Sequence, residues 1–178
     1  MPRERLTRGA IQVYTGDGKG KTTTALGLAC RALGQGFRVY MVQFLKGRET
    51  GESALAARLS PDLTLRFFGR PGLVNLKSPS PADLAFIQEA WQLAREVLGS
   101  GDYDLVILDE INLVLAHLII PFAELAETLN ARPPWVEVVL TGRQAPPELL
   151  ALADLVTEMH PVKHYYQAGV KARRGIEW

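Results

Sequence analysis

The chain has 178 residues, which suits one domain with a substantial buried core. Its composition is that of an ordinary globular protein, and a formal net charge of +1 gives no global electrostatic basis for binding nucleic acid or a membrane. No apolar run approaches the ~18 residues of a membrane span, and the charged N-terminus has no apolar signal core, so we expect a cytoplasmic protein.

Short apolar runs alternate with longer helical patterns along the chain. In chain order we expect a strand at 10–14, a helix at 22–33, strands at 38–44 and 63–67, a helix that begins after an N-cap at Ser80, a strand at 103–109, a helix at 122–129, a strand at 136–140, a helix at 147–152 and a strand at 155–159. This alternation predicts a mostly parallel central sheet in a three-layer α/β fold. Segments 45–53 and 69–79 resist assignment, and loops of their composition often carry function.

Two helices carry apolar residues at helical spacing. In the first, Cys30 falls on the spacing Leu26, Cys30, Leu33, so we predict that it is a small buried residue rather than a reactive thiol. As the only cysteine it excludes an internal disulfide and suits a reducing compartment. In the helix after Ser80, the apolar positions Leu84, Ile87, Trp91, Ala94 and Leu98 predict one face packed on the sheet.

The segment TGDGKGKTT, residues 15–23, lies between the first strand and the first helix. It resembles the phosphate-binding pattern G-x-x-x-x-G-K-[ST] but is one residue short, because Thr15 stands where the pattern has glycine. Backbone amides in such a loop and at the start of the following helix favour anions. Lys21 adds a charge for phosphate oxygens, and the Thr22 hydroxyl is placed to bind Mg²⁺. We therefore predict a site for ATP and Mg²⁺ rather than a glycine-rich turn.

Two further polar elements follow expected strands. Asp109 and Glu110 end the run LVILDE, the usual place for an acid that holds a magnesium ion, although an acidic pair there is equally typical of a helix cap. We favour Glu110 as the ligand, with Asp109 behind it. Arg143 in LTGR and Lys46 after the second strand could reach a triphosphate or be plain surface cations.

Other kinds of reactive site are not indicated. The three histidines, at positions 117, 160 and 164, are not spaced as a transition-metal cluster. No serine elbow or other nucleophile and base signature is present. The residues thus predict ATP and Mg²⁺ and leave the second substrate open.

Taken in order, the segments TGDGKGKTT, VQFLKG, ILDE, LNARP, LTGR and HPVKHYYQAGVKARRGIEW resemble the ATP:corrinoid adenosyltransferases of the bacterial P-loop type. The resemblance covers residues 9–178. It implies a P-loop NTPase fold of the RecA-like type, a homodimer, and transfer of the 5′-deoxyadenosyl group of MgATP to reduced cobalamin or a precursor corrinoid. In that reaction Co(I) attacks the ribose C5′ atom and the whole triphosphate leaves.

The resemblance also implies roles for residues of this sequence. Because the enzyme must align cobalt with C5′ and neutralise the departing triphosphate, the candidate catalytic residues are Lys21, Glu110 and Arg143. The candidate ATP contacts are Thr15, Gly16, Asp17, Gly18, Lys19, Gly20, Lys21, Thr22, Thr23 and Lys46. The candidate Mg²⁺ ligands are Thr22 and Glu110, with Asp109 in support.

The sequence departs from the family in the loop before the long helix. Better-known members carry an aromatic pair there, thought to press on the corrin and displace its lower ligand, whereas GRPGLVNLKSPS offers only the aliphatic candidates Leu73 and Leu76. We expect one domain over 1–178, with a short N-terminal extension at 1–8 and a C-terminal tail, 161–178, near the active site. A flavoprotein reductant is a candidate partner. The alternative functions are a RecA-like ATPase that couples nucleotide state to a protein partner and, third, a small-molecule kinase.

Overall fold

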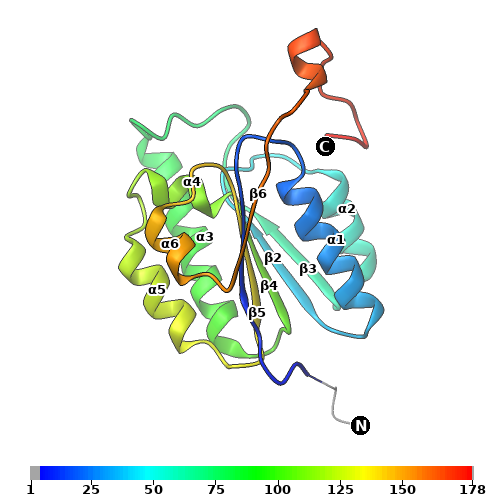
Figure 1. The fold of residues 1–178 in the computed structure, drawn as a ribbon, viewed down its shortest axis with the longest axis vertical. Helices are drawn as coiled ribbons and strands as arrows, with labels where there is room; N and C mark the ends of the chain where they lie inside the picture. Colours follow the sequence, from blue (N-terminus) through cyan, green and yellow to red (C-terminus); the bar gives the residue numbers. More distant parts are fainter. Residues whose placement is uncertain (1–4, 178) are drawn as a thin grey trace.

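The computed structural model describes residues 5–177 and contains a six-stranded sheet with helices on both faces (Figure 1). The strands are β1 (Ile11–Thr15), β2 (Val39–Gln43), β3 (Leu63–Phe67), β4 (Leu105–Asp109), β5 (Glu137–Thr141) and β6 (Leu155–Glu158). Their order is β3-β2-β4-β5-β1-β6, and all neighbouring pairs are parallel. The carboxyl ends of the strands therefore meet at one edge, where open α/β sheets bind ligands.

Two layers of helices enclose this sheet. They are α1 (Lys21–Gly34), α2 (Gly51–Leu59), α3 (Pro81–Ser100), α4 (Ile111–Ala116), α5 (Phe122–Ala131) and α6 (Pro147–Leu152), followed by a 3₁₀ turn, η1 (Tyr165–Ala168). In Figure 1, α1 and α2 cover one face, and α3, α4, α5 and α6 cover the other. The predicted three-layer α/β fold with a parallel sheet is confirmed.

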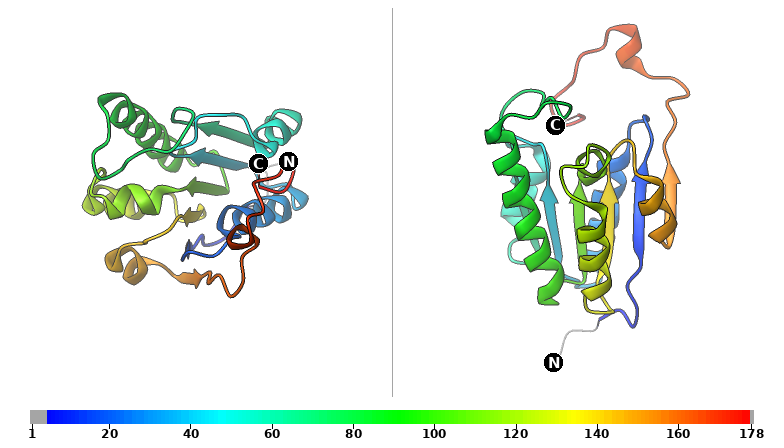
Figure 2. Two further views of the ribbon diagram at one scale, coloured as in Figure 1. Left: turned by 90° about the horizontal axis from the view of Figure 1, so that it is seen from above. Right: turned by 90° about the vertical axis from the view of Figure 1, so that its left-hand side faces the viewer.

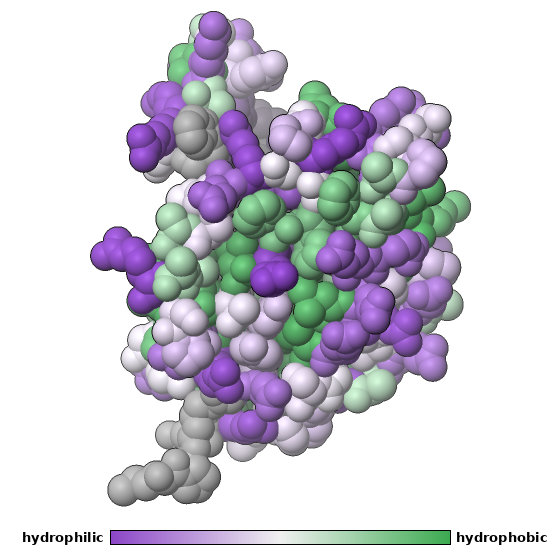
Figure 3. All heavy atoms as spheres, turned by 180° about the vertical axis from the view of Figure 1, so that it is seen from behind, coloured by the Kyte–Doolittle hydropathy of each residue, from purple (hydrophilic) through white to green (hydrophobic). Residues whose placement is uncertain are grey.

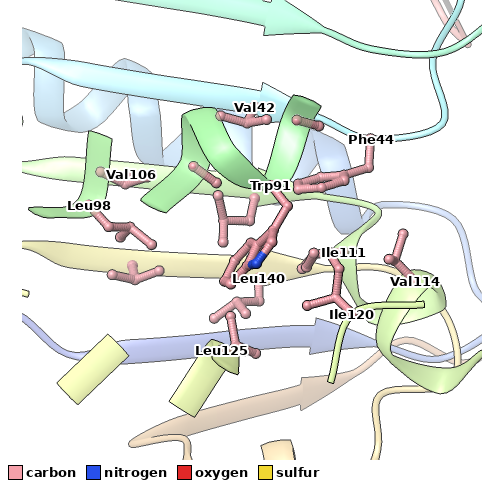
Figure 4. Packing of buried hydrophobic residues seen from close by; sticks show 14 of the residues in the cluster. Val42, Phe44, Trp91, Leu98, Val106, Ile111, Val114, Ile120, Leu125 and Leu140 are labelled. Carbon is pink, nitrogen blue, oxygen red and sulfur yellow. The ribbon is translucent and has the colours of Figure 1, made fainter. Parts of the chain in front are cut away.

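Each face of the sheet has its own apolar core. Along β4, Leu105 and Ile107 belong to the cluster beneath α1 and α2, whereas Val106 and Leu108 belong to the larger cluster on the opposite face. Because side chains alternate along a strand, only a strand covered on both faces needs this unbroken apolar run. On the larger side the indole ring of Trp91 lies at the centre of the packing between α3, α5 and the sheet (Figure 4).

Helix α3 has the start and the face that its sequence predicts, with one difference. The Ser80 side chain accepts a hydrogen bond from the Asp83 backbone N–H, and Pro81 occupies the first turn. The apolar residues Ile87, Trp91, Ala94 and Leu98 are buried as expected. Leu84, in the first turn, belongs to the predicted face but is 38% exposed.

The buried face of α1 differs from the predicted one. Cys30 is exposed, and the prediction that it is buried was wrong. The residues that face the sheet are Ala25, Ala29 and Ala32. Each of them comes one position before a residue of the predicted face. Alanine side chains let the helix lie close to the strands, and the larger Leu26 and Leu33 are left at its flanks, half-buried.

Two short helices were not predicted. Helix α2 begins at Gly51, inside the segment 45–53 that resisted assignment. Helix α4 begins at Ile111, directly after Glu110, whose φ of 65° lies in the left-handed region. The sharp turn at Glu110 separates the apolar run of β4 from that of α4. No glycine or proline lies between the two runs, so the sequence does not mark the turn.

The chain after β6 leaves the sheet and rises above its carboxyl edge (Figure 2). Figure 3 shows this C-terminal tail as a lobe that stands above the rest of the surface. It carries exposed apolar side chains, Val162 at 98% and Tyr166 at 74% exposure. Residues 1–4 of the expected N-terminal extension and Trp178 of the expected tail lie outside the described residues. Over residues 5–177, none of the helices combines the length and the apolar character that crossing a bilayer requires.

Candidate active site

A cavity of about 560 Å³ lies where the glycine loop meets α1. Its walls come from that loop, from α1 and α2, from the segments that follow β2, β4 and β5, and from the C-terminal tail. The predicted site residues that line it are Asp17, Gly18, Lys19, Gly20, Lys21, Thr22, Thr23, Lys46, Glu110 and Arg143. The predicted residues Thr15, Gly16, Asp109, Leu73 and Leu76 are not among the described residues of the lining. The roles of all these residues stay predictions.

The glycine loop is packed tightly against the end of β6. Gly16 has φ +90°, and a Cβ atom there would lie 2.4 Å from the Met159 carbonyl oxygen. The Gly18 N–H donates to the same oxygen at 2.7 Å. A larger residue at position 16 would push the loop away from β6, so glycine is required there for steric as well as backbone reasons. The shortened loop therefore keeps a fixed path into α1.

Lys21 points into the curve of this loop. Its Nζ donates to the carbonyl oxygens of Gly16 and Gly18, both at 2.7 Å, and the residue is 9% exposed. Burial lowers the pKa of Lys21, and the nearby Glu110 carboxylate opposes that shift. The loop thus holds a cation in the wall of the cavity, at the first residue of α1, and a cation at a helix N-terminus suits phosphate oxygens.

Asp109 is fully buried behind the cavity and accepts three hydrogen bonds. Its Oδ1 accepts from Thr22 Oγ1 at 2.8 Å and from Thr141 Oγ1 at 2.6 Å, and its Oδ2 accepts from Gln43 Nε2 at 3.0 Å. Because the Thr22 proton is directed at Asp109, the lone pairs of the Thr22 oxygen remain available to a cation in the cavity. Asp109 is placed to orient Thr22 rather than to enter the cavity itself.

Glu110, in contrast, lines the cavity and has an oxygen without a partner. Its Oε2 is buried and makes no hydrogen bond with any described residue. Burial raises the pKa of Glu110, the neighbouring Asp109 raises it further, and Lys21 opposes the shift. Its left-handed φ costs about 1–3 kcal/mol for a residue with a side chain, a cost typical of functional positions. A buried carboxylate oxygen in the cavity that Thr22 also lines fits a magnesium ion, which takes one or two carboxylates together with substrate phosphates and water.

Arg143 and Lys46 also border the cavity. Arg143 follows β5, its side chain is 58% exposed, and its Nε lies 3.7 Å from Asp17 Oδ1. The Lys46 Nζ lies 3.2 Å from Glu52 Oε1. Glu52 also lines the cavity and was not identified from the sequence, although an acid directly after Thr50 and Gly51 fits the first turn of a helix.

The C-terminal tail closes one side of the cavity. Its lining residues are His164, Gly175, Ile176 and Glu177. Lys19 Nζ donates to the Ile176 carbonyl oxygen at 3.3 Å and lies 3.8 Å from Glu177 Oε1. Hydrogen bonds from Arg173 and Tyr165 lower the pKa of Glu177 to about 2. The tail therefore presents a preformed carboxylate to a lysine of the glycine loop.

The two segments that resisted assignment, 45–53 and 69–79, lie against each other, because a Cβ atom at Gly47 would be only 1.9 Å from the Arg70 carbonyl carbon. The Lys46 N–H donates to the Phe68 carbonyl at 2.9 Å, which continues the pairing of β2 with β3. Arg70 Nε donates to Asp83 Oδ1 at 2.6 Å and fixes the second loop to the start of α3. Within that loop Leu73 is 99% exposed, whereas Leu76 is half-buried and packs on the larger core.

Comparisons with known proteins show the family to which the chain belongs. The family model for ATP:corrinoid adenosyltransferase BtuR/CobO/CobP matches residues 7–178. A corrinoid adenosyltransferase from Pseudomonas aeruginosa is 40% identical over 100% of this chain and 88% of its own length. One from Escherichia coli K12 and the corrinoid adenosyltransferase CobA from Salmonella typhimurium are each 41% identical over 96% of this chain and 86% of their own length.

A solved structure shares the fold. It is the flagellar accessory protein FlaH from Methanocaldococcus jannaschii, with a TM-score of 0.58 and 15% identity over 89% of this chain and 77% of that one. The likeness supports the P-loop NTPase fold of the RecA-like type that was predicted. With a family model that spans nearly the whole chain and relatives at about 40% identity, this chain belongs to the ATP:corrinoid adenosyltransferase family.

Proposed function

We propose that this chain transfers the 5′-deoxyadenosyl group of MgATP to the Co(I) centre of a reduced corrinoid and releases triphosphate. The observation that carries the proposal is the buried Lys21 at the centre of the glycine loop, in a cavity at the carboxyl edge of the sheet. The cobalt–carbon bond forms as the C5′–oxygen bond breaks, and the bonding electrons leave with the triphosphate. The protein therefore needs to bind an anion and align two substrates, and it needs no strong base.

The cations of the cavity suit the leaving group. Lys19, Lys21, Lys46 and Arg143 approach the cavity from three different segments of the chain. Charge that develops on the bridging oxygen as C5′–O breaks spreads over the triphosphate, and oriented cations and amides in a partly buried site stabilise it without rearranging. We assign these four side chains to that task.

Magnesium fits the same site. Thr22 and Glu110 would hold the ion, with Asp109 accepting the Thr22 proton and so fixing the threonine oxygen. When bound, Mg²⁺ would neutralise part of the triphosphate charge. The Glu110 oxygen, which is buried and without a hydrogen-bond partner, supports this placement.

The remaining assignments rest on the resemblance to the family. We propose a homodimer in the cytoplasm, a flavoprotein as the source of the electron that generates Co(I), and contact between the corrin ring and the loop 69–79. Leu73, which is almost fully exposed, is the side chain of that loop best placed for such contact.

Identification of the phosphate product tests the function. The protein is incubated anaerobically with MgATP and chemically reduced cobalamin. Intact triphosphate together with a light-sensitive cobalt–carbon product is the expected result. Formation of ADP and phosphate regardless of corrinoid would instead establish the alternative, a RecA-like ATPase.

Alanine at Leu73 and at Leu76 should have different effects. Leu73→Ala should leave the melting temperature unchanged and raise the KM for the corrinoid up to about tenfold, because an exposed leucine contributes only where a ligand covers it. Leu76→Ala should lower the free energy of unfolding by about 1–2 kcal/mol, since it opens space at the edge of the core. Leu59→Ala, at the end of α2, is the control for corrinoid affinity. Equal corrinoid KM values for Leu73→Ala and wild type would remove this loop from the corrinoid site.

A further inference from the structure

The side chains around Glu52 connect the cavity with the buried acid of β4. Glu52 lies in the first turn of α2, and its side chain is 14% exposed. Its Oε1 accepts hydrogen bonds from Lys46 Nζ and from Gln43 Nε2, both at 3.2 Å. The same Gln43 nitrogen donates to Asp109 Oδ2 at 3.0 Å. Both protons of the Gln43 amide are therefore used, one on each of two carboxylates.

The orientation of the Gln43 amide is set by its two carboxylate partners. Gln43 is fully buried, and its Oε1 has no hydrogen-bond partner among the described residues. An unsatisfied buried carbonyl is costly. The amide nevertheless directs its nitrogen at Glu52 and Asp109, where a donor reduces the repulsion between two carboxylates in a region of low dielectric constant. The bridge thus fixes the two acids relative to each other.

Each end of the bridge holds a side chain that lines the cavity. At one end Glu52 holds the Lys46 ammonium, and at the other Asp109 accepts the Thr22 hydroxyl proton. A lysine loses side-chain entropy when it becomes fixed on an anion, and Lys46 has lost much of that freedom already. Burial acts to raise the pKa of Glu52, but hydrogen bonds and the charge of Lys46 outweigh it and lower the pKa. Glu52 therefore stays ionised beside Lys46 at neutral pH.

We propose that Glu52 is a positioning residue of the triphosphate site, holding Lys46 at the cavity and, through Gln43, keeping Asp109 directed at Thr22. Glu52 acts through these side chains and does not touch the reacting atoms. The inference rests on the proposed function, because it assigns the triphosphate as the anion that Lys46 meets.

A double-mutant cycle on nucleotide binding tests this role. The variants are Glu52→Gln, Lys46→Met and the double variant, and the equilibrium Kd for MgATP is measured without corrinoid. We expect Lys46→Met to raise the Kd about tenfold and Glu52→Gln to raise it about three- to tenfold. The double variant should raise it by clearly less than the product of the two single effects, because both single variants remove the contact between Lys46 and Glu52. The KM for MgATP in turnover should rise by the same factors.

Glu49→Gln is the matched control, since it removes the same charge from an exposed side chain of the same segment and should leave the Kd unchanged. Additive effects of Glu52→Gln and Lys46→Met, or a Glu52→Gln variant that binds like Glu49→Gln, would overturn the proposal. If Glu52→Gln does not fold, Glu52→Asp takes its place, because it withdraws the carboxylate from Lys46 and must show the same coupling. Coupling in Kd without a triphosphate product would reject the proposed function alone, and product without coupling would reject the positioning role alone.

Discussion

Replacing Lys21 with alanine is expected to lower kcat/KM for adenosyl transfer by about 100-fold or more, the usual cost of removing one oriented donor from a developing anion. The ammonium lies inside the curve of the glycine loop, held by the carbonyl oxygens of Gly16 and Gly18. No other lysine has this position among the described residues. Steady-state rates at saturating corrinoid, with triphosphate as the measured product, give the effect.

Two controls separate this effect from a change of fold or of overall charge. Arg95→Ala removes a cation from the exposed side of α3 and should leave the rate unchanged. The melting temperature of Lys21→Ala shows whether the loop survives the loss of the two hydrogen bonds. If Lys21→Ala and Thr22→Ala both turn over like the wild type, the glycine loop is not the triphosphate site.

The parts of the fold that sequence predicted well are those whose signal lies within one short stretch of residues. The strand ending at Asp109 is marked by an unbroken apolar run because both faces of a central strand are covered. The start of α3 is marked by Ser80 and Pro81, which act on the backbone next to them. The loop from Thr15 to Lys21 is marked by its glycines, because its tight path leaves no room for a Cβ atom at Gly16 or Gly18.

The features that sequence did not predict depend on how the elements begin and pack in three dimensions. The exposure of Cys30 follows from α1 packing through Ala25 and Ala29, a choice between two faces that periodicity alone does not settle. The contact of Glu52 with Lys46 depends on a helix that begins within an irregular segment. Likewise, nothing near Lys19 in the sequence indicates that Glu177 lies beside it.

The distinction between Asp109 and Glu110 was only a preference from sequence, and it leads to the second large effect. Glu110→Gln should lower kcat/KM by about 100-fold, because the variant binds Mg²⁺ less tightly. Each of these two factors of ten corresponds to about 1.36 kcal/mol of lost transition-state stabilisation. The glutamine keeps the shape of the side chain but not its charge. A titration of activity with Mg²⁺ should show half-saturation at a higher concentration than in the wild type.

Stability in metal-free and nucleotide-free buffer should separate the two acids further. Burial raises the pKa of Glu110 in the folded protein, so the ionised side chain lowers the free energy of unfolding. This penalty is absent at pH values below the ordinary carboxyl pKa and is complete at pH values above the raised pKa. Glu110→Gln should therefore melt at or above the wild-type temperature at neutral pH, with the difference vanishing in acid. Asp109→Asn should melt lower, since it replaces an acceptor of three hydrogen bonds. An unchanged Mg²⁺ requirement in Glu110→Gln, together with a lowered melting temperature, would place Glu110 in the structural scaffold and leave the metal to another group.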